Sequence, residues 1–239
     1  GIKNVLVGGL AGDALNTGSD NIAIGMEALT TDDVGERTIA IGSQAAYSQN
    51  IATAGITYNT LVGFQAGYQN VVGTGNTYVG YQAGVGVSGN SQFGNTVVGA
   101  LAFDSVSSGN NNTIYGNQAG DGITTGDNNI CIGHQSDTTA ATVSQAIVIG
   151  AGVTGAANTV TFGSSSNKIT STFTGTPNWA HSSDERLKKN IQDVPIGLTF
   201  INDLRPVTYN WKGNHELDSS DKELEHLYKE NAEDNVFDT

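Results

Sequence analysis

A short internal repeat limits the folds open to this chain more than any other feature. Copies of the pattern NTxVGxQAG carry a central glycine, which falls at Gly8, Gly25, Gly42, Gly63, Gly80, Gly99, Gly116, Gly133, Gly150 and Gly163. Six of the nine steps between these glycines are 17 residues, and the others are 21, 19 and 13. Such a period leaves no room for a helix of ordinary length plus a strand. It therefore predicts an all-β fold, a parallel β-solenoid rod with one coil per repeat.

The stacking of coils gives further expectations. Hydrogen-bonded strands lie about 4.8 Å apart, so ten coils would make a rod of roughly 50 Å. The extra residues of the two longest steps are expected to form loops around 48–58 and 85–92. Glutamines that recur two residues after a central glycine predict a ladder of stacked amides, formed by Gln44, Gln65, Gln82, Gln118 and Gln135.

The three residues before each central glycine are expected to form a strand, whose side chains alternate between two faces. We expect the first and third residues, such as Thr60 and Val62, to face the coil interior. The middle residues would then face outward: Leu6, Ala23, Ala40, Leu61, Tyr78, Val97, Ile114, Cys131, Val148 and Thr161. Because nine of these ten are apolar, we predict an apolar stripe that identical rods cover in a closed homo-oligomer. Periodicity does not choose between two subunits and three.

The repeats resemble the head repeats of trimeric autotransporter adhesins of the YadA type, and similar repeats in viral tail fibres, over roughly residues 4–165. The resemblance implies a left-handed parallel β-roll that forms a homotrimer. The 17-residue step is longer than the usual period of that family.

Composition divides the chain into two expected domains, a repeat solenoid over residues 1–176 and a second domain over 177–239. Only Gly197 and Gly213 of the 32 glycines follow residue 176, whereas all three prolines and both tryptophans do. Lys and Arg minus Asp and Glu give 3 − 10 = −7 before the boundary and 7 − 13 = −6 after it. A nucleic-acid partner is therefore not expected. No apolar run of about 18 residues predicts membrane insertion, and the single cysteine, Cys131, predicts no internal disulfide.

The stretch AHSSDERLKKNI, residues 180–191, begins the charged part of the chain. Its local pattern is typical of a helix start, because Ser182 with Glu185 three residues later forms a capping box. Ser183 and Lys188 are five residues apart, about 140° around a straight helix. A helix alone would therefore not bring these two side chains together.

SDERLKKNI, followed by LRPVTYNWK at residues 204–212, resembles the intramolecular chaperone domain that ends many bacteriophage tail fibres and tailspikes and is known from endosialidases. The resemblance implies a small α+β segment that trimerises, guides the folding of the preceding fibre and is released by self-cleavage. It places the scissile bond between Ser182 and Ser183, with Ser183 as nucleophile and Lys188 as its base. The family's GFIAQE-like segment and long C-terminal helix do not follow, so we expect only the N-terminal part of this domain.

Other residue groups give weaker expectations. The four histidines lack metal-ligand spacing, and no metal or other cofactor is expected. The adjacent Asp32 and Asp33 are expected to solvate a turn rather than to form the separated carboxylate pair of a glycosidase. Six aromatics are expected mainly to pack over coil edges and the subunit seam, with stacking on sugars or a protein receptor as the alternative: Tyr58, Phe64, Tyr68, Tyr81, Phe93 and Phe103.

Together these features predict a structural and host-attachment protein of a viral tail fibre or spike, located in the virion. Its partners would be two further copies of itself, other tail proteins, and a host cell-surface receptor that is a glycan or a protein. A bacterial trimeric surface adhesin, extracellular or at the cell surface, is the alternative. A glycan depolymerase would need opposed carboxylates. An ice-binding surface would need outward threonines, whereas we expect Thr60, Thr77, Thr96 and Thr113 to face inward.

Overall fold

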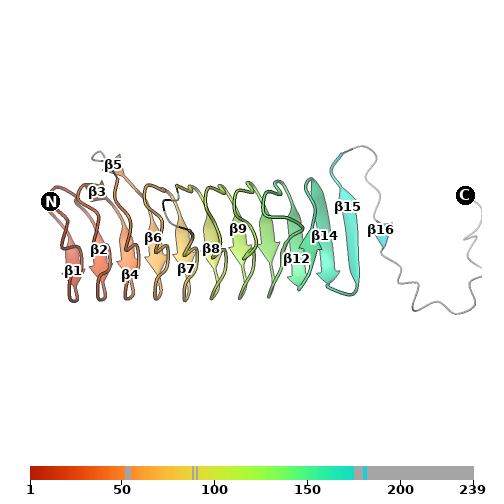
Figure 1. Ribbon diagram of the computed structural model, residues 1–239, viewed down its shortest axis with the longest axis horizontal. Coiled ribbons are helices and arrows are strands. Elements are labelled where there is room, and N and C mark those ends of the chain that lie inside the picture. Colours follow the sequence, from red (N-terminus) through yellow and green to blue (C-terminus); the bar gives the residue numbers. More distant parts are fainter. Residues whose placement is uncertain (52–54, 88, 90, 175–179, 182–239) are drawn as a thin grey trace, which may run out of the picture. The chain divides into compact units, whose positions relative to one another are not determined.

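The computed structural model describes residues 1–51, 55–87, 89, 91–174 and 180–181. These residues lie in the first of the two units into which the chain divides, Gly1–Ser183. The described part is all-β, and its coils stack in chain order as a parallel β-solenoid of about nine turns (Figure 1). The predicted fold class of the repeat region is confirmed. The predicted α+β segment lies outside the described residues.

One sheet of twelve strands runs along the solenoid. Each coil contributes one strand to its parallel part: β1 (Val5–Val7), β2 (Ile22–Ile24), β4 (Ile39–Ile41), β6 (Thr60–Val62), β7 (Thr77–Val79), β8 (Thr96–Val98), β9 (Thr113–Tyr115), β10 (Ile130–Ile132), β12 (Ile147–Ala151) and β14 (Thr159–Ser164). The strands β15 (Lys168–Thr172) and β16 (Ala180–His181) continue the sheet in antiparallel pairing. The strands therefore follow the repeat found in the sequence.

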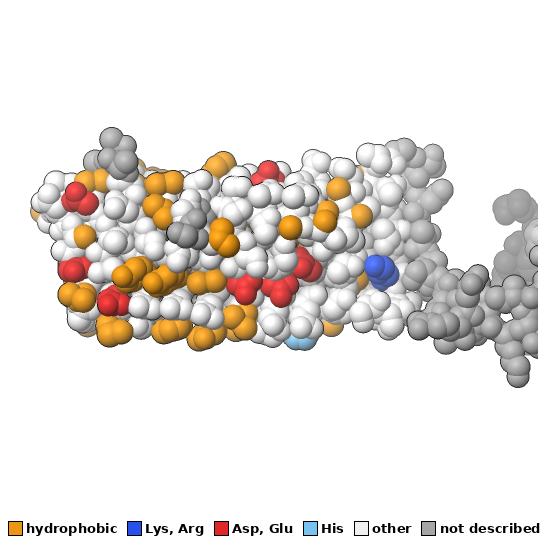
Figure 2. All heavy atoms as spheres, in the orientation of Figure 1, with side chains coloured by type: hydrophobic (Ala, Val, Ile, Leu, Met, Phe, Trp, Pro, Cys, Tyr) orange, Lys and Arg blue, Asp and Glu red, His pale blue; other side chains and the backbone are white. Residues whose placement is uncertain are grey.

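The register of the sheet aligns equivalent repeat positions in neighbouring coils. Leu61 pairs with Tyr78, and Tyr78 pairs with Val97. Two small parallel sheets lie elsewhere on the coils, one of β3 (Gly35–Glu36) with β5 (Gly55–Ile56), the other of β11 (Asp137–Thr138) with β13 (Thr154–Gly155). The strand β5 belongs to the 21-residue step. The face drawn in Figure 2 carries acidic side chains scattered along the solenoid and little basic side-chain surface.

The predicted direction of the strand side chains is wrong, because the middle residue of each triplet faces the coil interior. Leu61, Tyr78 and Val97 have no exposed surface, and Ile114 is 1% exposed. The first and third residues of the same strands are half-buried or exposed. Leu6 is 43% exposed because its coil has a neighbour on one side only. Strand alternation allowed either face to be inward, and the narrow coil has room for one strand side chain rather than two.

In several coils the interior is filled by a pair of residues whose sizes compensate. The middle strand residue meets the residue six positions later, and a Cβ atom on Gly84 would lie 2.5 Å from Cε2 of Tyr78. A Cβ atom on Gly120 would likewise lie 2.9 Å from Cδ1 of Ile114. Where the strand residue is Ala23, the later position is instead Leu29, which is fully buried. In these coils a large side chain at one position thus goes with a small residue at the other, which keeps the interior closely packed.

The central glycines are required by their backbone conformation and by the spacing of the coils. All ten have φ between +129° and +151°, where residues with side chains are strained. A Cβ atom on Gly116 would lie 2.5 Å from the carbonyl oxygen of Gly133 in the next coil. The glycine repeat therefore marks a position where neighbouring backbones come too close for any side chain.

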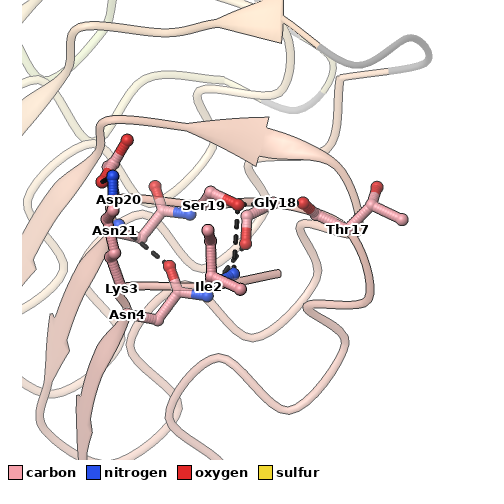
Figure 3. A network of polar contacts seen from close by, with 8 residues as sticks. All are labelled: Ile2, Lys3, Asn4, Thr17, Gly18, Ser19, Asp20 and Asn21. Atoms are coloured by element: carbon pink, nitrogen blue, oxygen red, sulfur yellow. Dashed lines mark hydrogen bonds and ion pairs between the residues drawn. The ribbon is translucent and has the colours of Figure 1, made fainter.

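A ladder of buried asparagines, which the sequence analysis did not single out, joins the coils. The Asn112 backbone N–H donates to Oδ1 of Asn95 at 2.8 Å, and Nδ2 of Asn95 donates to the Gly109 carbonyl at 2.9 Å. Asn4 begins the ladder by accepting from the Asn21 N–H at 2.9 Å (Figure 3). Each asparagine thus satisfies backbone groups that would be costly to bury unpaired. The signal for this role was the recurrent asparagine that opens each NTxVG motif.

Thr38 stands where the neighbouring repeats have Asn21 and Asn59, so it interrupts the asparagine ladder. A separate network of polar side chains surrounds Thr38. Nε2 of Gln49 lies 2.6 Å from Oδ2 of Asp32 and 2.8 Å from Oγ1 of Thr38. Asn59 donates to Oε1 of Gln49 at 2.9 Å. Asp32 is fully buried and accepts from the Gly35 N–H at 3.0 Å. The expectation that Asp32 solvates a turn is therefore wrong, since its carboxylate closes a turn inside the coil.

Candidate functional site

The predicted cleavage residues, Ser182, Ser183 and Lys188, lie outside the described residues. Their proposed roles therefore remain a prediction from the sequence. The described solenoid carries three surfaces that could serve a function: the outer face of the long sheet, an amide ladder bordered by aromatic rings, and a row of acidic residues.

The outer face of the sheet, which we call the strand face, consists of the first and third residues of each strand triplet. Two columns run along it: Val5, Ile22, Ile39, Thr60, Thr77, Thr96, Thr113, Ile130, Ile147 and Val160 form one, and Val7, Ile24, Ile41, Val62, Val79, Val98, Tyr115, Ile132, Ile149 and Phe162 form the other. No charged residue occurs in either column. Val7 is 56% exposed and Tyr115 is 59% exposed.

The strand face replaces the predicted apolar stripe with a broader one. The column that begins at Val7 is apolar in every coil, whereas the other column has threonine in four successive coils. An apolar surface of this length is larger than most monomeric proteins expose, and strands covered on both faces are typically apolar throughout. An apolar stripe along the rod therefore exists, but at the flanking positions of each triplet rather than the middle one. Its chemistry fits an association surface.

The prediction that four threonines face inward is wrong. Thr60, Thr77, Thr96 and Thr113 pair in register on the strand face, so the argument used against an ice-binding surface does not hold. The threonines occupy only four coils, and the same column contains valine or isoleucine in the others. The strand face is therefore predominantly apolar rather than a regular hydroxyl array.

The predicted glutamine ladder is confirmed over two runs. Nε2 of Gln65 donates to Oε1 of Gln44 at 2.8 Å, and Nε2 of Gln82 donates to Oε1 of Gln65 at 2.7 Å. Gln44 in turn donates to Oε2 of Glu27 at 2.7 Å. Gln135 donates to Gln118 at 3.2 Å in the second run. Leu101 has the equivalent position between the runs.

Two stacked pairs of aromatic rings accompany the first glutamine run. The rings of Phe64 and Tyr81 have centroids 5.5 Å apart and planes 11° apart. The rings of Tyr47 and Tyr68 have centroids 4.8 Å apart, also with planes 11° apart. Figure 2 shows rows of hydrophobic side chains along the N-terminal half of the solenoid. We call Phe64, Tyr81, Tyr47, Tyr68 and the ladder from Glu27 to Gln82 the aromatic-amide surface.

The sequence predicted part of this surface. Phe64, Tyr68 and Tyr81 were expected to pack over coil edges or to contact a ligand, and Phe64 and Tyr81 are 41% and 51% exposed. Tyr47 was missed, although it precedes Tyr68 by the same 21-residue step that separates the central glycines of their coils. Phe103, in contrast, is fully buried in the coil interior.

Acidic residues follow one another in the later coils at similar repeat positions. Asp104, Asp121 and Asp137 are 17 and 16 residues apart. Burial, together with the nearby Asp121, raises the pKa of Asp137 to about 6. Burial also raises the pKa of Asp104. The carboxylate of Asp137 accepts from the N–H groups of Gly122 at 3.0 Å and Thr138 at 2.7 Å. It therefore closes a turn, and its raised pKa makes it easier to protonate than an ordinary carboxylate.

The remaining polar groups do not assemble into another site in the described part of the chain. Within residues 1–51, 55–87, 89, 91–174 and 180–181, no group of three His, Cys, Asp or Glu is placed to hold a metal ion. The same residues include no helix with the length and hydropathy needed to cross a bilayer. Cys131 is buried in the coil interior, and burial raises the pKa of its thiol to about 12. Its sulfur therefore serves packing rather than thiolate chemistry.

Comparison with known proteins bears on the C-terminal segment. Residues 183–227 match the family model described as chaperone of endosialidase. No curated protein and no solved structure matches the chain. The chain thus combines a repeat-built β-solenoid with a segment of the endosialidase chaperone type, an arrangement that fits a tail-fibre type of protein.

Proposed function

We propose that this chain is part of a viral tail fibre or spike that attaches to a host cell. In this proposal the solenoid is a homotrimeric shaft or head, and residues 177–239 form the chaperone domain that assembles and then releases it. The match of residues 183–227 to the endosialidase chaperone family, directly after a repeat solenoid, is the observation that carries the proposal. Other tail proteins and a host receptor would be its partners.

The strand face supports the trimeric part of the proposal. Its two columns are uncharged, run along successive coils and are in register. Three copies that pack these faces together would remove a large apolar area from water, which favours association by roughly 25 cal/mol per Å² before the costs of association. The overall charge of the solenoid, −7, would remain outside such a seam.

Self-cleavage would use groups of the chain itself. Ser183 Oγ would attack the carbonyl carbon of Ser182 while Lys188 takes the hydroxyl proton and passes it to the departing amide nitrogen. The resulting ester between the Ser182 acyl group and Ser183 Oγ would then be hydrolysed by water. Lys188 can act only when neutral, and burial or the neighbouring cations Arg186 and Lys189 would lower its pKa.

The test is expression of the full chain, with Ser183→Ala and Ser182→Ala as paired variants. We expect wild type and Ser182→Ala to yield a product that ends at residue 182, and Ser183→Ala to remain intact, when measured by intact mass. Native light scattering should give three chains per particle. Uncleaved monomer from all three proteins would contradict the proposal, and cleavage in Ser183→Ala would contradict the assigned nucleophile.

A bacterial trimeric surface adhesin is the second candidate, because the solenoid would serve that role equally well. The endosialidase-type segment favours the viral protein. Release of the solenoid as a cleaved trimer would support the viral role, whereas the adhesin would keep its rod attached to the cell surface.

A further inference from the structure

We infer that the aromatic-amide surface is a binding site for a neutral glycan. This inference rests on the attachment role proposed above and names the class of receptor. The surface comes from the turns after the strands rather than from the strand face. A seam between copies could therefore use the strand face and leave this surface to a ligand.

Folding does not require the aromatics of this surface. Phe64 and Tyr81 directly follow the central glycine of their coils, where later coils have Ala100, Asn117 and His134. Those coils keep the same strand register with small or polar residues in that position. The stacked aromatics are therefore confined to a few coils, as expected for a localised binding site.

The amide ladder offers hydrogen-bonding groups in a regular row. A glutamine amide has two N–H donors and an oxygen with two lone pairs. In Gln65 one donor reaches Gln44 and the oxygen accepts from Gln82, which leaves a second donor and a second lone pair. Sugar hydroxyls both donate and accept. Successive glutamines, about 4.8 Å apart along the stack, can therefore contact successive parts of one oligosaccharide.

Aromatic rings beside the ladder suit the apolar C–H faces of sugars. Phe64 and Tyr81 are about half exposed, and such rings combine a large apolar surface with little conformational freedom to lose. Specific ligand sites typically pair apolar area with a few fixed polar groups. The aromatic-amide surface combines stacked rings with stacked amides, and so has that composition.

The scarcity of positive charge on the solenoid favours a neutral glycan over an acidic one. The only Lys and Arg residues before residue 177 are Lys3, Arg37 and Lys168. Arg37 lies over the ring of Tyr58, 5.9 Å from its centroid, and not among the residues of the aromatic-amide surface. Glu27 ends the ladder with a carboxylate. A sialylated or uronic-acid glycan would meet negative charge with no cation to compensate it.

Binding of the full chain to an array of neutral and acidic glycans would test the site. We expect binding to at least one neutral glycan, and a loss of affinity of about tenfold or more in the double variant Phe64→Asn, Tyr81→Asn. Asparagine is chosen because Asn117 has the same position in a folded coil. Phe93→Ala, which removes a 52% exposed ring outside this surface, should bind as wild type. Circular dichroism should show that both variants keep the solenoid fold, with a modest loss of stability in the double variant because a stacked ring pair is removed.

The outcomes separate this inference from the proposed function. If no neutral glycan binds, or if only acidic glycans bind, the inference is wrong even when the chain trimerises and cleaves. Equal loss of binding in Phe93→Ala and in the double variant would also contradict it. Glycan binding by an uncleaved monomer would support the site while contradicting the proposed maturation.

Discussion

At the scale of single residues, the half-buried carboxyl of Asp137 makes stability depend on pH. Its pKa is about 6 in the folded chain against 3.8 as the ordinary value, chiefly because burial disfavours the charged form. Between about pH 4 and pH 6, this carboxyl is therefore protonated in the folded state and ionised in the unfolded state. The contribution of this carboxyl to the free energy of unfolding is highest at low pH and falls as the pH rises through this window.

We predict that the thermal midpoint of wild type rises when the pH is lowered from 7 to 5, and that Asp137→Asn shows a smaller rise. Circular dichroism melts at several pH values would measure this. Some pH dependence should remain in the variant, because burial also raises the pKa of Asp32 and Asp104. Asp33→Asn, an exposed neighbour of Asp32 in sequence, is the control. Identical pH profiles for wild type and Asp137→Asn would show that Asp137 is not the cause.

At the scale of the coil, two positions share the interior volume. Tyr78 meets Gly84 in one coil, whereas Ala23 and Leu29 fill the same two positions in another. Leu29 has φ +53° and Gly84 has φ +56°, so leucine is compatible with the backbone at this position. Glycine is required at position 84 because any side chain there would clash with the ring of Tyr78.

A double-mutant cycle tests this compensation. Tyr78→Ala alone should cost about 3 to 5 kcal/mol through a cavity, and Gly84→Leu alone about 1 to 3 kcal/mol through overpacking. Together they should cost clearly less than the sum, since the introduced leucine would fill the space of the lost ring. Tyr78→Ala with Gly120→Leu, a pair from different coils, should be additive. Urea unfolding would measure all of these, and additivity in both cycles would contradict the pairing.

At the scale of the whole molecule, the strand face determines whether copies associate. Val79 is half-buried on this face. An aspartate there would remain hydrated in a single chain but would be buried without a cation in a seam, at a cost of several kcal/mol per charge. We predict that Val79→Asp keeps the solenoid fold and loses the trimer, as measured by circular dichroism and light scattering.

Val72→Asp is the matched control for the assembly prediction. Val72 is 44% exposed and lies in a turn outside the strand face. The same substitution there should leave the oligomeric state unchanged. If Val79→Asp still forms trimers as stable as wild type, the strand face is not the seam.

The sequence by itself determined the parallel β-solenoid, because a 17-residue period with a recurrent glycine permits little except stacked coils. It also predicted the amide ladder from Gln44 to Gln82, since equal spacing places equal residues above one another. The tertiary structure alone decided that Tyr78 and Leu61 point inward while Val62 and Val79 point outward. Alternation along a strand defines two faces without saying which is inside, and only closure of the coil around a narrow interior makes that choice.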